Sequence, residues 1–289
     1  MIKLYNFDEL KPEEILNRDI RAEKNVEDVV DGIIADVCAR GDDALKDYAL
    51  KFDGAKIDAL QVTQEEIDEA FAGMDPYFLE TLREAAANIE SFHRQQVHKN
   101  FVVNDKPGIV LGQKYTPIEK AGVYVPGGTA AYPSTVLMDV IPAKVAGVSE
   151  IVMTTPAGKD GRVNPVILAA AATAGVTKIF KTGGAQAVAA LAYGTQSIPA
   201  VDKIVGPGNI YVATAKRKVF GKVGIDMIAG PSEILVLADG GCNPAWVAAD
   251  LLSQAEHDKL ASPVLVTDSP ELAKAVQAEL EVQIPQLPR

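Results

Sequence analysis

The chain has 289 residues, of which 48% are hydrophobic and 23% charged, and its formal net charge is −11. This length is sufficient for two domains, and the composition is that of an ordinary globular protein. The acidic excess lies in residues 1–100, which hold 23 acidic and 12 basic side chains. Because the chain is acidic and has no basic stripe, we do not expect it to bind nucleic acid.

Membrane insertion and secretion are not expected either. No apolar run reaches the length of a membrane span, and the first thirty residues lack the apolar core of a signal peptide. The two cysteines, Cys38 and Cys242, are far apart and form no paired motif. This cysteine usage predicts a cytoplasmic protein.

Residues 24–100 are predicted to be helical. Apolar residues recur between positions 26 and 37 at the spacing of one helical face, and Gly41 follows them as a typical helix end. Asp75-Pro76 supplies an N-cap residue followed by proline at the first helical position. The acidic part of the chain is therefore expected to be a solvated helical segment.

From residue 108 onward, short β-rich runs alternate with helical patterns. The expected strands are 109–115, 122–125, 151–155, 178–182, 203–205, 234–238 and 264–267. The expected helices begin at Pro133, with a kink at Pro142, and continue with 165–174, 185–193, 210–220, one that follows Asn243-Pro244 and ends near 257, and 270–282. This alternation predicts an α/β fold with a parallel sheet and right-handed crossovers.

Glycine-rich turns recur where a predicted strand leads into a helix. They are Pro126-Gly127-Gly128, Gly183-Gly184, Gly206-Pro207-Gly208 and Gly230-Pro231. None has the GxGxxG spacing of a standard dinucleotide site, and each alone is typical of an ordinary tight turn. In an open parallel sheet, however, such turns meet at one edge, where ligands bind. Together they predict a ligand cleft.

Near the end of a predicted helix, Gln254 and His257 are three residues apart and share one face. An imidazole nitrogen beside an amide oxygen can form half of a zinc site. The alternative is a polar helix end with one solvated histidine.

Five motifs occur in a fixed order, namely GVYVPGG at 122–128, GGAQA at 183–187, GPGN at 206–209, AGPSE at 229–233 and DLLSQAEH at 250–257. This set closely resembles histidinol dehydrogenases, from about residue 10 to the end of the chain. The resemblance implies a cytoplasmic homodimer that uses NAD and zinc to oxidise L-histidinol twice, through histidinal, to L-histidine, in the last step of histidine biosynthesis. It also implies incomplete Rossmann-like domains that are distantly similar to aldehyde dehydrogenases.

The resemblance assigns roles to individual residues. Tyr124, Gln186 and Asn209 match residues that contact NAD, and their amide and phenol groups are suited to ribose and phosphate oxygens. Ser232 matches a substrate contact. Gln254 and His257 match two zinc ligands that also contact the substrate.

The resemblance also implies a domain arrangement. Residues 1–123 are expected to form the helical N-terminal part of a first α/β domain, and 124–232 a second, NAD-binding α/β domain. Residues 233–289 are expected to return to the first domain.

The family pattern continues past residue 289, where it carries a Glu-His pair for proton transfer, an Asp zinc ligand and a His ligand from the partner subunit. Nothing in residues 258–289 matches them. We therefore expect the chain to be an N-terminal fragment of a family member, with an incomplete zinc site and no dehydrogenase activity. The alternatives are a fragment that binds nucleotide without catalysis, or one that persists only as a dimerising scaffold.

Other chemically active residues have ordinary interpretations. Cys242 is expected to be a structural or surface cysteine, because no histidine lies near it to activate the thiol. His93 and His98 are expected to be solvated, and Glu256 to be a helix-end carboxylate. Trp246 is expected to pack in a core or an interface.

Overall fold

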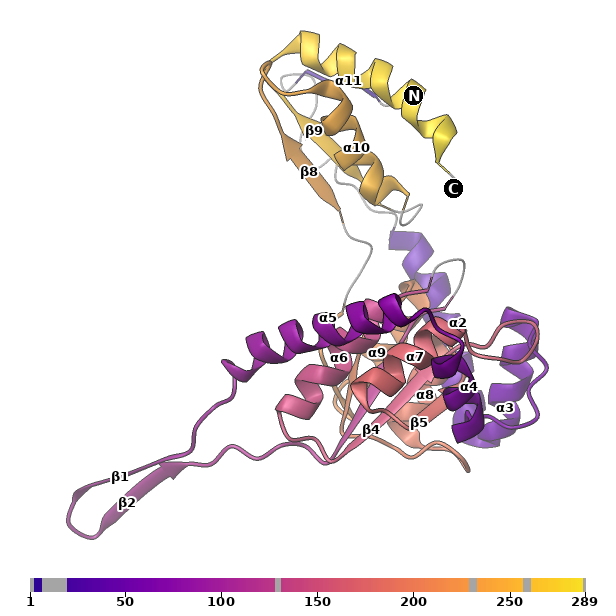
Figure 1. Ribbon diagram of the computed structural model, residues 1–289, viewed down its shortest axis with the longest axis vertical. Coiled ribbons are helices and arrows are strands. Elements are labelled where there is room, and N and C mark those ends of the chain that lie inside the picture. Colours follow the sequence, from indigo (N-terminus) through magenta and orange to yellow (C-terminus); the bar gives the residue numbers. More distant parts are fainter. Residues whose placement is uncertain (1–2, 7–19, 128–130, 229–232, 257–260, 288–289) are drawn as a thin grey trace. The chain divides into compact units, whose positions relative to one another are not determined.

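The computed structural model describes residues 3–6, 20–127, 131–228, 233–256 and 261–287 (Figure 1). It contains two compact units, one formed by residues 24–228 and the other by 1–23 together with 229–289. None of the described helices is long and apolar enough to cross a bilayer. The expected grouping of 1–123 with 233–289 concerns contacts between these units and stays a prediction.

A five-stranded parallel sheet forms the centre of the unit at 24–228, with the strand order β5-β4-β3-β6-β7. Its strands are β3 (Lys120–Tyr124), β4 (Glu150–Thr155), β5 (Lys178–Lys181), β6 (Lys203–Val205) and β7 (Gly224–Ile225). The chain runs outward from β3 to β5 and then crosses to β6 on the other side of β3. The parallel α/β fold expected from the sequence is confirmed.

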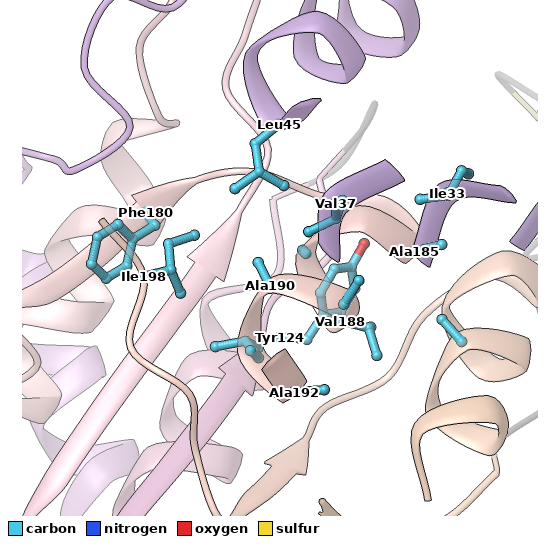
Figure 2. Close-up of a cluster of buried hydrophobic side chains, with 14 of the residues drawn as sticks. Ile33, Val37, Leu45, Tyr124, Phe180, Ala185, Val188, Ala190, Ala192 and Ile198 are labelled. Atoms are coloured by element: carbon cyan, nitrogen blue, oxygen red, sulfur yellow. The ribbon is translucent and has the colours of Figure 1, made fainter. Parts of the chain in front are cut away.

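Helices cover both faces of this sheet (Figure 1). One face packs against α4 (Gln64–Ala72), α5 (Pro76–Arg94), α6 (Pro133–Val145) and α7 (Pro165–Ala174). The other packs against α2 (Ile20–Arg40), α3 (Asp42–Tyr48), the π-helix η1 (Ala49–Asp53), α8 (Gly184–Tyr193) and α9 (Ile210–Val219). Because strand side chains alternate, Val123 and Val125 enter the first core and Tyr124 the second (Figure 2).

The helix boundaries follow from local sequence signals. The Asp75 carboxylate caps α5 by accepting a hydrogen bond from the Tyr77 N–H at 2.8 Å, with Pro76 at the first helical position. Helix α2 ends at Arg40, and Gly41 follows with φ 58°, a conformation that glycine adopts without strain. Helix α6 continues through Pro142 to Val145.

An antiparallel hairpin follows α5, consisting of β1 (Phe101–Lys106) and β2 (Ile109–Gln113). Every residue of both strands is exposed. The second strand was predicted from the sequence, but the first was missed because the predicted helical segment extended to residue 100. The Pro107-Gly108 loop, with Gly108 at φ 75°, was the available hairpin signal.

Residues 233–256 and 261–287 of the second unit form a two-stranded parallel sheet, two α-helices and a short 3₁₀ helix. The strands are β8 (Ile234–Leu237) and β9 (Pro263–Val266), and the helices are α10 (Pro244–Ala255), α11 (Pro270–Gln283) and the short 3₁₀ helix η2 (Ile284–Gln286). Apolar faces of α10 and α11 pack together around Leu251 and Val276. Trp246 is 74% exposed, so the expectation that it packs in a core is wrong; an interface role stays a prediction.

The outer edge of β5 is covered by an earlier segment of the chain. The Val62 N–H donates to the Ile179 carbonyl at 2.9 Å, and the Lys181 N–H donates to the Leu60 carbonyl at 2.7 Å. Gln61 thereby forms an antiparallel bridge with Phe180. At the opposite edge of the sheet, β7 is two residues long.

Candidate functional site

The strand order places a topological switch point between β3 and β6. In open parallel sheets, ligands bind at the carboxyl ends of the strands beside such a point. The turn that begins at Pro126 follows β3, and the turn that begins at Gly206 follows β6. The structure thus brings two of the predicted glycine turns to the position where the fold favours a ligand. Gly128 and the Gly230-Pro231 turn lie outside the described residues.

Gly206 needs to be glycine because its backbone is pressed against β3. Its φ is 120°, and a Cβ at this position would lie 2.1 Å from the Tyr124 carbonyl oxygen. Gly127 is similarly close to the next turn, since a Cβ there would lie 2.2 Å from Pro156 Cγ. The glycines therefore let these two turns pack tightly against the end of β3 and against Pro156, at the sheet edge where an open parallel sheet binds ligands.

Tyr124 is the last residue of β3, and its side chain is buried beneath the start of α8 (Figure 2). The phenol oxygen accepts a hydrogen bond from the Gly184 N–H at 3.1 Å. Burial raises the pKa of Tyr124 to about 12, although the Gly184 N–H acts in the opposite direction. The phenol therefore keeps its proton near neutral pH and can donate it to a ligand oxygen.

Gln186 lies in the first turn of α8 and is buried. Helix α8 begins at Gly184 after Gly183, which supplies no side-chain cap, so the Tyr124 hydroxyl takes one of the N–H groups at this helix end. A Cβ on Gly184 would lie 2.7 Å from Gln186 Oε1, which places this amide over the same glycine. Tyr124 and Gln186, predicted as cofactor contacts, therefore meet at Gly184.

Asn209 is the N-cap of α9. Its side-chain oxygen accepts hydrogen bonds from the Tyr211 and Val212 N–H groups, both at 3.1 Å. Because capping uses this oxygen, the exposed NH₂ group is the part of the side chain that can donate to a ligand. The structure thus gives Asn209 a structural role that the sequence analysis did not identify.

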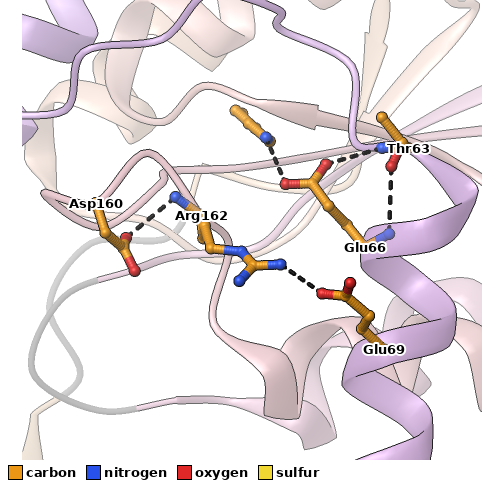
Figure 3. Close-up of polar contacts among 6 residues, drawn as sticks. Thr63, Glu66, Glu69, Asp160 and Arg162 are labelled. Carbon is orange, nitrogen blue, oxygen red and sulfur yellow. Dashed lines mark hydrogen bonds and ion pairs between the residues drawn. The ribbon is translucent and has the colours of Figure 1, made fainter.

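A cavity of about 760 Å³ opens beside the turn at 126–127. Several charged side chains line it, and two of them, Glu66 and Glu69, each form an ion pair (Figure 3). Arg162 pairs with Glu69 at 2.6 Å, and Lys181 pairs with Glu66 at 2.7 Å. Burial alone would raise the pKa of Glu66, but hydrogen bonds from Lys181 and from the Thr63 backbone outweigh it and lower the pKa. These charged side chains were not predicted from the sequence as part of a site.

One part of this charged group, the pair of Thr63 and Glu66, could have been recognised in the sequence. Thr63 and Glu66 have the spacing of a capping box, and both of its hydrogen bonds are present at the start of α4 (Figure 3). Glu66 therefore serves the helix end with one carboxylate oxygen and Lys181 with the other.

A second cavity, of about 610 Å³, lies between the end of α5, the helix α6 and strand β6. Asp139 lines it, and its Oδ2 atom is buried without a hydrogen-bond partner among the described residues. Burial and the nearby Asp226 carboxylate raise the pKa of Asp139 to about 7, while Lys216 acts in the opposite direction. His98 stacks on Tyr115 at the rim, with ring centroids 4.6 Å apart.

The predicted metal ligands belong to the second unit. Gln254 lies in the last turn of α10, and its Oε1 atom is buried with no hydrogen-bond partner in the described part of the chain. A buried amide oxygen without a partner is costly, and a metal ion would satisfy it. His257 and Ser232, the other residues predicted here, lie outside the described residues. Within the described ranges, no three His, Cys, Asp or Glu side chains gather as a metal-binding group.

Cys242 is exposed, and its Sγ atom lies 3.7 Å from an Asp239 carboxylate oxygen. A neighbouring carboxylate does not provide the electropositive surroundings that activate a thiol. This environment fits the expected surface cysteine.

Comparisons with known proteins agree with the predicted motifs. A family model described as histidinol dehydrogenase matches residues 16–289. The histidinol dehydrogenase of Geobacillus kaustophilus is 60% identical over 257 residues, which cover 89% of this chain and 61% of that protein. The one from Bacillus subtilis is 58% identical over 260 residues, which cover 90% of this chain and 61% of that protein.

The chain belongs to the histidinol dehydrogenase family. The crystal structure of histidinol dehydrogenase from Elizabethkingia anophelis superimposes with a TM-score of 0.81 at 39% sequence identity, covering 94% of this chain and 66% of that one. The fold is therefore shared with a solved family member. The chain spans about three fifths of the length of the Geobacillus and Bacillus proteins.

Proposed function

We propose that the protein takes part in the NAD-dependent oxidation of L-histidinol to L-histidine through histidinal, with the unit at 24–228 binding the dinucleotide. The observation that supports this most is the meeting of Tyr124 and Gln186 at Gly184, beside two glycine turns at the switch point. Bound NAD supplies the hydride acceptor for both oxidation steps. The Tyr124 phenol and the Asn209 NH₂ group donate hydrogen bonds to its ribose and phosphate oxygens.

The residues present fit a dinucleotide. The glycines at 127, 206 and 208 pack so closely against neighbouring protein atoms that a Cβ would clash, and Gly183 supplies no side-chain cap to the first turn of α8, where Tyr124 takes the Gly184 N–H. Free N–H groups at a helix start favour a phosphate. Titration of the 289-residue protein with NAD, monitored by calorimetry, tests this placement through Gln186→Ala, with Gln196→Ala, which lies away from these turns, as the control. An equal NAD affinity in both variants would contradict it.

Zinc is proposed for the second unit, where the residues also fit. The partnerless Gln254 Oε1 supports this assignment, and His257 would supply the imidazole beside it. The metal, when bound, supplies a positive charge that orients the substrate's imidazole and amine. Ser232 is proposed to contact the substrate. Equilibrium dialysis against zinc tests the assignment in a version of the chain extended by the C-terminal part of the Bacillus subtilis relative, compared with its His257→Ala variant, while the 289-residue chain itself is expected to leave the site empty.

We further infer that the 289-residue polypeptide alone does not complete the oxidation. Gln254 and His257 are the two residues of this sequence that match the family's zinc ligands, and both are neutral. A zinc shell takes three or four protein ligands, and neutral ligands do not balance its charge. NADH formation from histidinol, measured beside the full-length Bacillus subtilis relative, tests this inference. Turnover by the 289-residue chain at a similar rate would overturn it.

This inactivity leaves the second candidate function open, which is nucleotide binding without catalysis. The cofactor turns lie in the unit at 24–228, whereas the matched zinc ligand Gln254 lies in the other unit. NAD binding by residues 24–228 is therefore possible without zinc.

The homodimer and the cytoplasmic location implied by the resemblance are also proposals; light scattering tests the homodimer. The two exposed, unpaired cysteines support the cytoplasmic location.

A further inference from the structure

A lysine buried on α9 contacts the turn that carries Asn209. Lys216 is 2% exposed, and its ammonium nitrogen donates a hydrogen bond to the Gly206 carbonyl at 2.9 Å. The same nitrogen forms an ion pair with Asp226, the residue after β7. Lysines are almost never fully buried unless they are paired, so this side chain has a specific structural task.

The partner of this lysine contacts the same glycine from the other side. Asp226 Oδ2 accepts a hydrogen bond from the Gly206 N–H at 2.9 Å, and its Oδ1 accepts one from the Met227 N–H at 2.6 Å. One ion pair therefore binds both the N–H and the carbonyl of Gly206. Charge-assisted hydrogen bonds of this kind are stronger than neutral ones and fix direction as well as distance.

The glycine held in this way is the one pressed against the end of β3. Its φ of 120° and the 2.1 Å approach of a hypothetical Cβ to the Tyr124 carbonyl show that the turn has little room to shift. Asn209 follows three residues later and caps α9, the helix that also carries Lys216. The ion pair holds Gly206, the turn leads from Gly206 to Asn209, and Asn209 caps the helix that carries Lys216.

We propose that Lys216 and Asp226 are positioning residues that hold the 206–208 turn in the conformation in which Asn209 meets the dinucleotide. Neither side chain has to touch the cofactor, because both act through the Gly206 backbone. The proposal rests on the placement of NAD over this turn under the proposed function. It assigns the affinity for NAD partly to an ion pair beneath the cofactor site.

A role in stability alone is the competing explanation. Burying an ion pair costs desolvation energy that offsets its attraction, so such pairs contribute little net stability. They do fix geometry, which is what a cofactor turn requires. The two explanations differ in what happens when stability is restored without the pair.

The first test replaces Lys216 by methionine, which keeps the side chain's length and removes its charge. The matched control is Lys144→Met, because Lys144 also donates to a backbone carbonyl, that of Ala174 at 2.6 Å, away from the cofactor turns. In Lys216→Met we expect NAD affinity to fall about tenfold and amide exchange at Gly206 to accelerate about tenfold, as for the loss of one charge-assisted bond. Lys144→Met should leave both quantities unchanged. Calorimetric titration and NMR-detected hydrogen exchange measure them.

The second test separates positioning from stability. Asp226→Asn removes the carboxylate that pairs with the buried Lys216 ammonium, so the melting temperature should fall; adding Lys216→Met removes that charge and should recover most of the loss. If the pair positions the turn, NAD affinity stays low in the double variant although stability returns. Recovery of NAD affinity together with stability would overturn the proposal.

The placement of NAD and the positioning role of the ion pair can be refuted separately. If the unaltered protein does not bind NAD, the proposed cofactor placement is wrong, and the exchange measurement still decides whether the pair orders the turn. If the unaltered protein binds NAD and Lys216→Met binds it equally well, the positioning role is wrong while the proposed function stands. Unchanged exchange at Gly206 in Lys216→Met would also overturn the positioning role.

Discussion

Tyr124 and Gly184 are separated by 60 positions in the sequence, yet the phenol oxygen of Tyr124 accepts a hydrogen bond from the Gly184 backbone N–H at 3.1 Å. This bond joins the end of β3 to the start of α8 and takes the place of a helix cap. It gives one side chain two tasks, since the oxygen satisfies the helix and the proton remains for a ligand.

Tyr124→Phe should separate these two tasks. The substitution keeps the ring and leaves the buried Gly184 N–H without its acceptor, which costs about 1–3 kcal/mol of folding stability. It also removes the donor proposed for NAD, so affinity should fall several-fold. Urea unfolding and calorimetric titration measure the two effects. Unaltered unfolding would show that the hydrogen bond contributes nothing to the folded state.

Gly206→Ala should be among the most damaging glycine substitutions in the chain, because a Cβ there meets the Tyr124 carbonyl at 2.1 Å. Gly221→Ala is the matched control, since Gly221 has φ 100° and no atom within 4 Å of its Cβ position. In the control, alanine suffers only the strain of a side chain at positive φ, about 1–3 kcal/mol. Gly206→Ala should lose clearly more, or fail to fold. Equal thermal unfolding of the two variants would contradict the steric argument.

Asn209→Ala should weaken both the helix end and the cofactor site. Loss of an N-cap costs about 0.5–2 kcal/mol, and loss of one amide hydrogen bond should reduce NAD affinity several-fold. Asn243→Ala is the control, because Asn243 caps α10 through the Ala245 N–H at 2.9 Å and lies in the other unit. It should lower the melting temperature without changing NAD affinity. Equal NAD affinity in both variants would argue against the role of Asn209.

Asp139 should make stability depend on pH in an unusual direction for a carboxyl group. Its pKa rises from the ordinary 3.8 to about 7 in the folded protein, so between these values the folded state holds a proton that the unfolded chain releases. The stabilisation is fully present below about pH 4 and is lost as the pH rises through about 7.

Asp139→Asn should remove this dependence. The variant should match the unaltered protein at pH 4 and exceed its unfolding free energy at pH 8, by about 1–3 kcal/mol for relief of a buried carboxylate without a partner. Denaturant unfolding across this pH range measures the difference between the two proteins. A constant difference between pH 4 and pH 8 would contradict the raised pKa.

The parts of the fold that the sequence predicted well are those set by local chemistry. The helix at 165–174 was expected with its observed bounds, because Asn164-Pro165 starts it and Gly175 ends it. Strand β1 was missed because its apolar residues follow a long helical pattern without a break and are covered by nothing within the described unit. The spacing of apolar residues alone does not distinguish such a strand from the end of a helix.

In the candidate site, too, the residues set by local chemistry could be predicted and those set by distant contacts could not. The glycine turns could be recognised from the sequence because backbone geometry requires glycine there, whereas Tyr124 was assigned only through the family resemblance. Lys216 and Asp226 could not, because a lysine in a sequence reads as a solvated charge and its burial depends on where β6 and β7 bring the chain. A pairing between residues brought together by the fold in this way has no sequence motif of fixed spacing that would predict it.

Both borders of the central sheet are closed to further growth. Along β5, residues 60–62 already occupy the row of backbone groups that an incoming strand would use, and β7 offers only two residues on the other side. Parallel sheets with long bare borders invite pairing with other chains, and short or occupied borders prevent it. Aggregation of this unit should therefore start elsewhere, at the exposed hairpin of β1 and β2, whose Val102 and Val110 are 71% and 72% exposed.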